Sequence, residues 1–556
     1  MKARRTALTL LFAAALAAFV LLLWDVQAVR GADFAAQAAR SLVETEPIPA
    51  ARGRLLDRKG RVLARDRTVW TLTVSDRVGE ETRTRLAALC REAGVSWEGG
   101  RAALSDVPAA LAARVKGEAL AGVTVLPAAV RESGGVLAPH LLGRVGRMSP
   151  GEWAVYQKKG YALDSLVGKD GAEAAFEDLL RGVPGLSRTE RDRSGRVLRS
   201  VCVRPPRPGR DVKLTLDRDL QRAARQALTA FLADHPAAVG AAAAVLDLSD
   251  GGVLALVSLP DYDPARLSRD YAALSADPAH PLMDRAIQGL YAPGSVFKLV
   301  TAAAALEEGA ITPGTRILDT GKYTYYATPQ PQCWLYRQQG RTHGLETVDQ
   351  AIADSCNVFF YDAGRRVGAA ALERYARALG LGQPTGIELA GEQAGAVAGP
   401  AYAARAGLPW YEGSVLSAAI GQENHRCTPL QLARLTAALV GEDHPVHLRL
   451  DAPPRPAAPG LTLDPANAAA IRKGMLAVTE EGSLAGAFSR LPWQAGAKTG
   501  SAQVAGARQA NAVLVAFAPF EAPRVALALV AEQGGSGAAL GPAAAEILSA
   551  WARTGA

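Results

Sequence analysis

Residues 293–306 have the sequence PGSVFKLVTAAAAL. A proline and a glycine ahead of an apolar run mark a helix start, so we predict a helix over Lys298–Leu306 with Ser295 in its first turn. Positions three apart share one face of a helix, which brings the Lys298 amine beside the Ser295 hydroxyl. A desolvated lysine can take the proton of a serine, and N–H groups at a helix start favour the negative charge that develops. Alone, the pattern is more typical of a helix-capping serine followed by a solvated lysine.

A second motif, Ser355-Cys356-Asn357, follows a helical pattern over Val348–Ala353. A hydroxyl and a carboxamide two residues apart can face one cleft from a loop between helices. The Ser355 hydroxyl could relay a proton, and the Asn357 amide could bond a peptide group of a substrate. Alone, this motif is more typical of a helix cap.

A third motif, Lys498-Thr499-Gly500-Ser501, precedes a strongly apolar run. On a strand, Lys498 and Gly500 would face one way and Thr499 and Ser501 the other. Gly500 leaves room for a substrate backbone beside the strand, and a cationic lysine with hydroxyls suits a terminal carboxylate. The motif therefore predicts a strand edge that binds an anionic end of a substrate.

The remaining pattern predicts an α+β protein. Strands are expected early and late in the second half, with long helical stretches between them, so the sheet should close between the two ends of that half. The dense prolines of Arg204–Gly209 mark a boundary before it. The expected elements are strands at Val212–Leu216, Ala241–Val245, Gly252–Ser258, Ala512–Phe517 and Val525–Val530, helices at Leu220–Leu232 and Pro542–Trp551, and a loop at Pro453–Pro459.

The first half carries no chemical motif. A helix is expected to continue from Gln27 to about Ala50, and residues 78–130 look helical and charged. Arg52–Ala64 is expected to form strand, turn and strand around Lys59-Gly60. A further helix is expected from Gly171 to Leu180.

The amino terminus predicts a membrane anchor. Thr6–Trp24 carries no charge and would span about 28 Å as a helix, close to one bilayer core. Lys2, Arg4 and Arg5 precede it and Asp25 follows, so the start should stay cytoplasmic and the rest should lie outside. A cleaved signal peptide is the alternative, although its apolar region is usually shorter.

The composition excludes several classes. The chain has 556 residues, of which 49% are hydrophobic and 21% charged, which excludes a disordered or collagen-like protein. Five cysteines are too few for a disulfide scaffold. The net charge of +8 is spread along the chain, so it fits an anionic cell surface and is no sign of nucleic-acid binding.

The sequence leaves three interpretations of Cys333 and Cys356 open. They flank His343, with Asp319 upstream. A disulfide is chemically plausible outside the cell, a zinc site could use all four residues, and two ordinary buried thiols are the simplest alternative.

In this order, on helix, loop and strand, the three motifs are typical of serine β-lactamases and penicillin-binding proteins. The chain resembles a class B penicillin-binding protein, a peptidoglycan D,D-transpeptidase, over nearly its whole length. The stretch from Pro409 to Gln422 resembles the elongation (cell-shape) branch more than the septal branch, and a sporulation-type relative stays open. The matching stretches are the anchor, Arg52–Ala64, Gly168–Gly182, Leu214–Asp217 with Leu220-Gln221, Pro293–Lys298, Gly421-Gln422 with Thr428-Pro429, and the strand after Lys498.

The resemblance implies the organisation of the chain. It implies a cytoplasmic tail at 1–5, a transmembrane anchor at 6–24, a pedestal resembling the class B dimerisation domain at 26–205, and a transpeptidase domain at 211–556 whose antiparallel sheet is flanked by helices. It also implies no glycosyltransferase domain. Two departures from the family pattern occur: Glu423 stands where a glycine often follows Gly421-Gln422, and Ser501 replaces the commoner threonine.

The resemblance also implies roles for the motif residues. Ser295 would attack the carbonyl between the two terminal D-alanines of a stem pentapeptide, with Lys298 as the base and backbone N–H groups of Ser295 and Ser501 holding the oxyanion. Ser355 would relay protons, and Asn357 would orient the stem peptide. The substrate carboxylate would be received by Lys498, Thr499, Gly500 and Ser501.

We expect no cofactor and assign no metal ligands. The implied partners are peptidoglycan stem peptides, β-lactams that acylate Ser295, the plasma membrane and a glycan polymerase of the SEDS family. A β-lactam sensor and a non-catalytic scaffold that activates such a polymerase are the alternative functions. A single span argues against the sensor, and three intact motifs argue against the scaffold.

Overall fold

The structure, a computed structural model, forms two compact units, each described here by itself. The smaller unit comprises residues 1–53, 68–129 and 181–210, and the larger comprises residues 54–67, 130–180 and 211–556. The expected loop at Pro453–Pro459 lies outside the described residues. The described residues are 2–34, 43–74, 78–97, 99–100, 102–120, 122–163, 165–191, 197–441, 443–452, 461–504 and 506–555.

The N-terminal helix α1 (Lys2–Trp24) continues into a π-helical turn, η1 (Asp25–Val29). Within the described residues, Thr9–Val29 is the one helical stretch long and apolar enough to cross a membrane, and none of it is buried against the protein. The expected helix from Gln27 to Ala50 is wrong in its second part, because Val43–Ile48 forms strand β1. That strand pairs with β8 (Gly185–Arg191), a partner far along the chain that local pattern does not reveal.

The smaller unit mixes strands with two helices. One sheet has the order β1-β8-β9, and β4 pairs with the second half of the long strand β3. Leu72, Leu86 and Leu111 form its buried core. The expected helical character of residues 78–130 is confirmed for α3 and α4 and wrong for β4 and β5, whose residues pair with β3. The bounds are β3 Val62–Val74, α3 Glu80–Glu92, β4 Ala102–Val107, α4 Ala109–Gly117, β5 Val123–Ser133 and β9 Val197–Arg204.

The larger unit is built on a five-stranded antiparallel sheet in the order β12-β11-β17-β16-β15. The early strand β11 lies beside the late strand β17, with Ala244 opposite Ala528, so the sheet closes between the two ends of this half as expected. Strand β15, which carries the Lys498 motif, forms one edge. The bounds are β11 Gly240–Asp247, β12 Val253–Leu259, β15 Gly496–Ala502, β16 Asn511–Ala518 and β17 Val525–Glu532.

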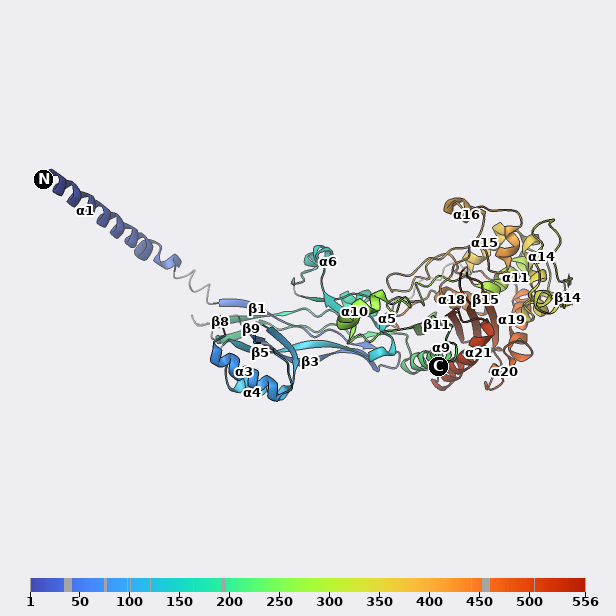
Figure 1. Ribbon diagram of the computed structural model, residues 1–556, viewed down its shortest axis with the longest axis horizontal. Coiled ribbons are helices and arrows are strands. Elements are labelled where there is room, and N and C mark those ends of the chain that lie inside the picture. The colour runs from blue at the N-terminus through green and yellow to red at the C-terminus, as the bar shows by residue number, and fades with distance from the viewer. Residues whose placement is uncertain are drawn as a thin grey trace. The chain divides into compact units, whose positions relative to one another are not determined.

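Helices cover both faces of this sheet. Alternate residues of a strand point to opposite faces, so Val513 and Val515 join one core while Leu514 joins the other. Helices α9 (Arg218–Asp234) and α21 (Gly541–Arg553) pack together on the Leu514 side (Figure 1). Helices α11 (Lys298–Glu307) and α18 (Pro429–Val440) pack on the Val513 side. The mixed α+β fold expected from the sequence is therefore confirmed.

The remaining elements of the larger unit lie around these layers. Near the sheet's edge, the 3₁₀ turn η4 packs against β15. The bounds are β2 Leu55–Leu56, η2 Gly135–Leu137, α5 Pro139–Leu142, β6 Val145–Arg147, α6 Pro150–Tyr156, η3 Gln157–Lys159, β7 Leu166–Gly168, α7 Gly171–Ala175, α8 Glu177–Leu180, β10 Val212–Lys213, α10 Leu267–Ala276, η4 Gly294–Phe297, β13 Ile317–Asp319, α12 Trp334–Gln339, β14 Gly344–Glu346, α13 Val348–Ala353, α14 Asn357–Val367, α15 Ala369–Ala378, α16 Pro400–Ala406, α17 Ser414–Ala419, α19 Pro465–Glu480, α20 Ala485–Phe488 and η5 Gly537–Leu540.

The strand-turn-strand segment at residues 54–64 is tied to the start of α9 by charge. The Asp57 side chain is fully buried and accepts N–H bonds from Lys59 and Arg61. The Arg61 guanidinium bonds Asp57 at 2.7 Å and reaches Asp219 at 2.5 Å. The Arg61 guanidinium thus joins the strand-turn-strand segment to the N-terminus of α9.

Candidate active site

Ser295 lies in the 3₁₀ turn η4, which leads directly into helix α11. The glycine before it, Gly294, has a φ of +54°, a conformation that side chains disfavour, so the Pro-Gly pair allows the chain to turn sharply into the helix. Val296 and Phe297 are buried, whereas Ser295 is half-buried and stays accessible. The turn thus presents one hydroxyl to the outside while its neighbours anchor it in the core.

Lys298 is completely buried at the start of α11. Its amine donates to the Ser355 carbonyl at 2.7 Å, to Ser355 Oγ at 3.2 Å and to Asn357 Oδ1 at 2.6 Å. Among the described residues, the Ser295 hydroxyl makes no hydrogen bond, so the amine is held by the second motif and not by the serine. Burial lowers the pKa of Lys298 to about 8, which suits a general base near neutral pH.

Ser355 occupies a strained turn between helices α13 and α14. Its φ is +54°, in the left-handed region that a serine rarely adopts, and its N–H bonds the Ile352 carbonyl at 3.3 Å. Such conformations cost about 1–3 kcal/mol and persist where the surrounding structure enforces them. The turn lets Ser355 and the first residue of α14, Asn357, both reach the Lys298 amine.

The third motif forms edge strand β15 with the expected alternation. Lys498 and Gly500 are buried, Thr499 is half-buried and Ser501 is exposed. The Lys498 amine donates to its neighbouring carbonyl of Thr499 at 3.3 Å. Burial, together with the charge of Lys298, places the pKa of Lys498 well below that of a free lysine. The Lys498 side chain therefore lies beneath the strand edge, while Thr499 and Ser501 lie on its more exposed side.

Close backbone packing joins the first and third motifs. A Cβ added to Gly500 would lie 2.7 Å from the Pro293 carbonyl oxygen and 3.3 Å from the Ser295 nitrogen. A Cβ added to Gly294 would lie 3.2 Å from the Ser501 carbonyl oxygen. No side chain fits between the strand and the turn, so the Ser295 turn and the Lys498 strand share one site.

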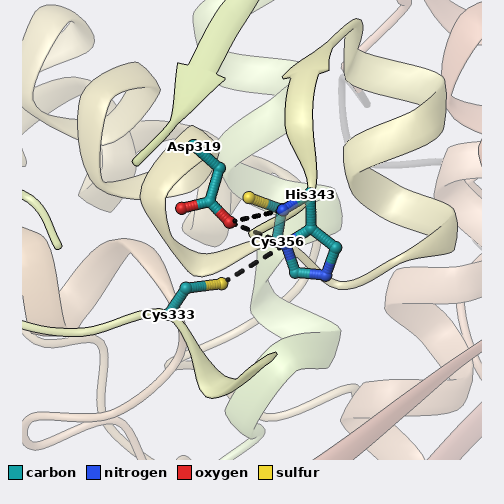
Figure 2. Close-up of side chains that lie close together, drawn as sticks. All are labelled: Asp319, Cys333, His343 and Cys356. Atoms are coloured by element: carbon teal, nitrogen blue, oxygen red, sulfur yellow. Dashed lines mark hydrogen bonds and ion pairs between the residues drawn. The ribbon is translucent and has the colours of Figure 1, made fainter. Parts of the chain in front are cut away.

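The four residues left open by the sequence form a compact cluster behind the second motif. Asp319, Cys333, His343 and Cys356 point toward one another (Figure 2), and one donor atom from each lies within 4.8 Å of the others. His343 Nδ1 lies 2.8 Å from Asp319 Oδ2 and 3.5 Å from Cys333 Sγ. Cys333 and Cys356 are both free thiols, so no disulfide joins them in this structure.

The cluster touches the catalytic motif directly. Cys333 Sγ accepts the backbone N–H of Asn357 at 3.4 Å, and Cys356 lies between Ser355 and Asn357. Hydrogen bonds from Cys356 and His343 lower the pKa of Cys333 to about 4 against the effect of burial. The cluster offers two sulfur donors, one nitrogen donor and one oxygen donor, which are ligand types that bind zinc. These atoms lie close enough together to surround one ion.

Two buried residues of the site have no signal in the sequence. Glu346, at the end of β14 and three residues after His343, is buried, and burial raises its pKa to about 8. His425 stacks on Phe297 inside the first motif, with ring centroids 4.0 Å apart. Neither belongs to a recognisable pattern, and both reach the site only through tertiary packing.

Known proteins share this organisation. The penicillin-binding protein transpeptidase domain matches residues 241–551, and the penicillin-binding protein dimerisation domain matches residues 47–214. Peptidoglycan D,D-transpeptidase MrdA of Escherichia coli (strain K12) is 30% identical over 582 residues, which cover 95% of this chain and 90% of that protein.

Two solved structures extend the likeness to three dimensions. A chain of "Structural coordination of polymerization and crosslinking by a peptidoglycan synthase complex" is 33% identical with a TM-score of 0.78, and the match covers 99% of this chain and 98% of that one. PBP2 from Helicobacter pylori, in complex with MreC, shares the fold at 23% identity and a TM-score of 0.78, covering 92% of this chain and 99% of that one. Because the likeness includes both domains and nearly the whole length, the chain belongs to the class B penicillin-binding proteins, the peptidoglycan D,D-transpeptidases.

Proposed function

We propose that Ser295 is the nucleophile with which this serine D,D-transpeptidase crosslinks peptidoglycan stem peptides during cell-wall elongation. The observation that carries this role is the meeting of three motifs in one site, with the Lys298 amine bonded to both Ser355 and Asn357 and the Lys498 strand packed against the Ser295 turn. Ser295 is the accessible hydroxyl of its turn, which a nucleophile requires.

Acylation would proceed in balanced steps. Ser295 Oγ bonds to the carbonyl carbon of the penultimate D-alanine while neutral Lys298 takes the hydroxyl proton. The C–N bond to the last D-alanine then breaks, and the proton passes from Lys298 through Ser355 Oγ to the departing amine. Backbone N–H groups of Ser295 and Ser501 stabilise the oxyanion, an effect commonly worth about 10²–10³ in rate.

The second half-reaction uses the same groups. An amine of a neighbouring stem peptide attacks the acyl carbon and gives its proton to the amine of Lys298. The C–O bond to Ser295 then breaks, and Lys298 returns the proton to Ser295 Oγ, which regenerates the enzyme. Asn357 orients the stem peptide. Because Thr499 and Ser501 face outward while Lys498 is buried, the hydroxyls contact the substrate carboxylate and the Lys498 amine lies beneath them.

We place the catalytic unit outside the cell on a single-pass anchor at 6–24, with residues 1–5 cytoplasmic, a pedestal at 26–205 and the transpeptidase domain at 211–556. The apolar helix without buried residues and the basic residues ahead of it support this orientation. A SEDS-family glycan polymerase is the proposed membrane partner, since the related chain at 33% identity belongs to a peptidoglycan synthase complex. β-Lactams would bind as substrate mimics that acylate Ser295.

The experiment that tests the nucleophile is labelling of the full-length protein with fluorescent penicillin. Wild type should take up one label per chain, and Ser295→Ala should take up none. Ser489→Ala, which removes an exposed hydroxyl elsewhere, is the matched control and should label fully. Equal labelling of wild type and Ser295→Ala would remove Ser295 from this role.

The Asp319, Cys333, His343 and Cys356 cluster is proposed to hold one zinc ion that fixes the turn carrying Ser355 and Asn357. The buried position of the cluster and its converging donor atoms support this assignment. When bound, the ion would cross-link the end of β13 and the residues directly before α12, β14 and α14, and no step of the acyl transfer passes through it.

Metal analysis of purified full-length protein tests the zinc site. One zinc per chain is expected in wild type and in Cys427→Ser, which alters a buried thiol outside the cluster. Cys333→Ser and Cys356→Ser should lose most of the metal. A zinc-free wild type whose mass is 2 Da below that of the reduced chain would instead show a disulfide.

A further inference from the structure

The turn that carries Ser295 is held from behind by residues 418–427, here called the cradle segment. The Gly294 N–H donates to the Gly421 carbonyl at 3.0 Å, and the Thr301 hydroxyl donates to the Ala419 carbonyl at 2.7 Å. Gly421 has a φ of +74°, and a Cβ there would lie 2.0 Å from the Gly294 oxygen. The cradle segment and the turn therefore touch backbone to backbone.

His425 of the cradle segment is fixed in one tautomer. The ring is completely buried, and its Nδ1 accepts the Ala398 N–H at 3.2 Å. Because a backbone N–H can only donate, Nδ1 must be unprotonated, and Nε2 carries the hydrogen that it donates to the Ala418 carbonyl at 3.1 Å. Burial lowers the pKa of His425 to about 3, so the ring is neutral near neutral pH.

The fixed ring lies against the nucleophile motif. His425 packs on Phe297 with ring centroids 4.0 Å apart and an angle of 36° between the planes. Phe297 is completely buried, follows Ser295 by two residues and directly precedes Lys298. A shift of the Phe297 ring would therefore move the backbone that carries both the nucleophile and its base.

We propose that His425 is a positioning residue for acylation. Its ring, held by two hydrogen bonds, fixes the position of the Phe297 ring and thereby directs the Ser295 hydroxyl toward the Lys298 amine. This inference rests on the proposed role of Ser295. The Ser295 hydroxyl makes no hydrogen bond among the described residues, so its place depends on the turn that carries it. A misplacement of about 1 Å at a reacting group can cost about a hundredfold in rate.

The test separates the binding and bond-forming steps of acylation in full-length protein. Stopped-flow measurements with fluorescent penicillin give the dissociation constant of the initial complex and the acylation rate constant. His425→Phe keeps a ring but loses both hydrogen bonds, and His425→Gln keeps the donor to Ala418 but loses the ring. In both variants we expect the rate constant to fall about ten- to a hundredfold, while the dissociation constant changes less than twofold.

Two further readouts distinguish positioning from other roles. The pH of half-maximal acylation should equal that of wild type in both variants, because His425 is neutral throughout and takes no part in proton transfer. The final label should still reach one per chain, in contrast to Ser295→Ala, which takes up none. Failure of the nucleophile assignment and failure of this inference are thus told apart.

Leu548→Ala is the matched control for lost stability. Leu548 is completely buried in α21, on the sheet face away from the Ser295 turn, so its truncation should lower the melting temperature and leave the acylation rate constant unchanged. Rate constants within twofold of wild type in both His425 variants would overturn the inference. So would an equal fall in a Leu548→Ala protein of the same melting temperature. Should the His425 variants fail to fold, Phe297→Leu removes the other ring of the contact and must show the same selective fall.

Discussion

The rate constant for acylation of Ser295 should rise with pH and reach half its maximum near pH 8. Lys298 is the proposed base, and only its neutral form can accept the hydroxyl proton. Because the amine is completely buried, its pKa falls to about 8, and the neutral form dominates above that pH. Roughly one eleventh of the enzyme is neutral at Lys298 at pH 7 and roughly ten elevenths at pH 9, so the rate constant should increase about tenfold between them.

Replacing the base provides the perturbation. Lys298→Arg keeps a long cationic side chain that stays protonated at all these pH values, so the rise with pH should vanish and the rate constant should fall about 10²–10⁴-fold. Lys473→Arg is the matched control, since Lys473 is 74% exposed on α19 and bonds Asp349 away from the site. Its profile should follow that of wild type.

The assay is single-turnover acylation with fluorescent penicillin between pH 6 and pH 9.5, with the dissociation constant measured at each pH. A rate constant that falls with rising pH would refute the assignment of Lys298 as the base. A half-maximum near the pKa of an exposed lysine would refute the link between its burial and its function, as would an unchanged profile in Lys298→Arg.

The other predictions concern stability and are measured by urea unfolding of the full chain. Glu423 has a φ of +61°, so Glu423→Gly should relieve left-handed strain and raise the free energy of unfolding by about 0.5–1 kcal/mol; a lower value would show that the side chain makes a stabilising contact. Gly421→Ala should lower that free energy by more than about 2 kcal/mol and slow acylation, because a Cβ would lie 2.0 Å from the Gly294 oxygen, and wild-type behaviour would contradict the close packing. Asp57→Ala should cost about 3 kcal/mol, because it removes the fully buried acceptor of the Arg61 guanidinium and of the Lys59 and Arg61 N–H groups, and a loss below about 1 kcal/mol would show that these bonds contribute little.

Sequence patterns predicted the catalytic half of this chain better than the first half. The strands around residues 241–258 and 512–530 and the helix after Ser295 follow from apolar runs and helix-start signals, and the structure confirms them. The helix expected over 27–50 and the helical character of 78–130 fail where β1, β4 and β5 occur. Those strands are stabilised by partners far along the chain, and neither helical period nor charge reveals a distant partner.

The sequence identified the candidate site residues, but it did not predict which of them contact one another. The sequence pointed to Lys298 beside Ser295, yet the amine bonds Ser355 and Asn357. The roles of all eight motif residues stay predictions until the labelling and pH experiments are done. Asp319, Cys333, His343 and Cys356 were singled out as a set with three readings, and only the folded chain shows their donor atoms converging with both thiols free.

The sequence by itself determined which chemical groups are present and which of them are neighbours along a helix or a strand. Local hydrogen bonding sets those periods, so a serine three residues before a lysine, or a lysine alternating with hydroxyls, can be read directly. Only the tertiary structure determines that Lys298 is buried away from water, that Ser355 adopts a left-handed backbone conformation and that the neutral ring of His425 packs against Phe297. These properties depend on burial by segments that are far apart in the chain. A local sequence pattern does not show which distant residues will surround a side chain, so it does not predict that burial.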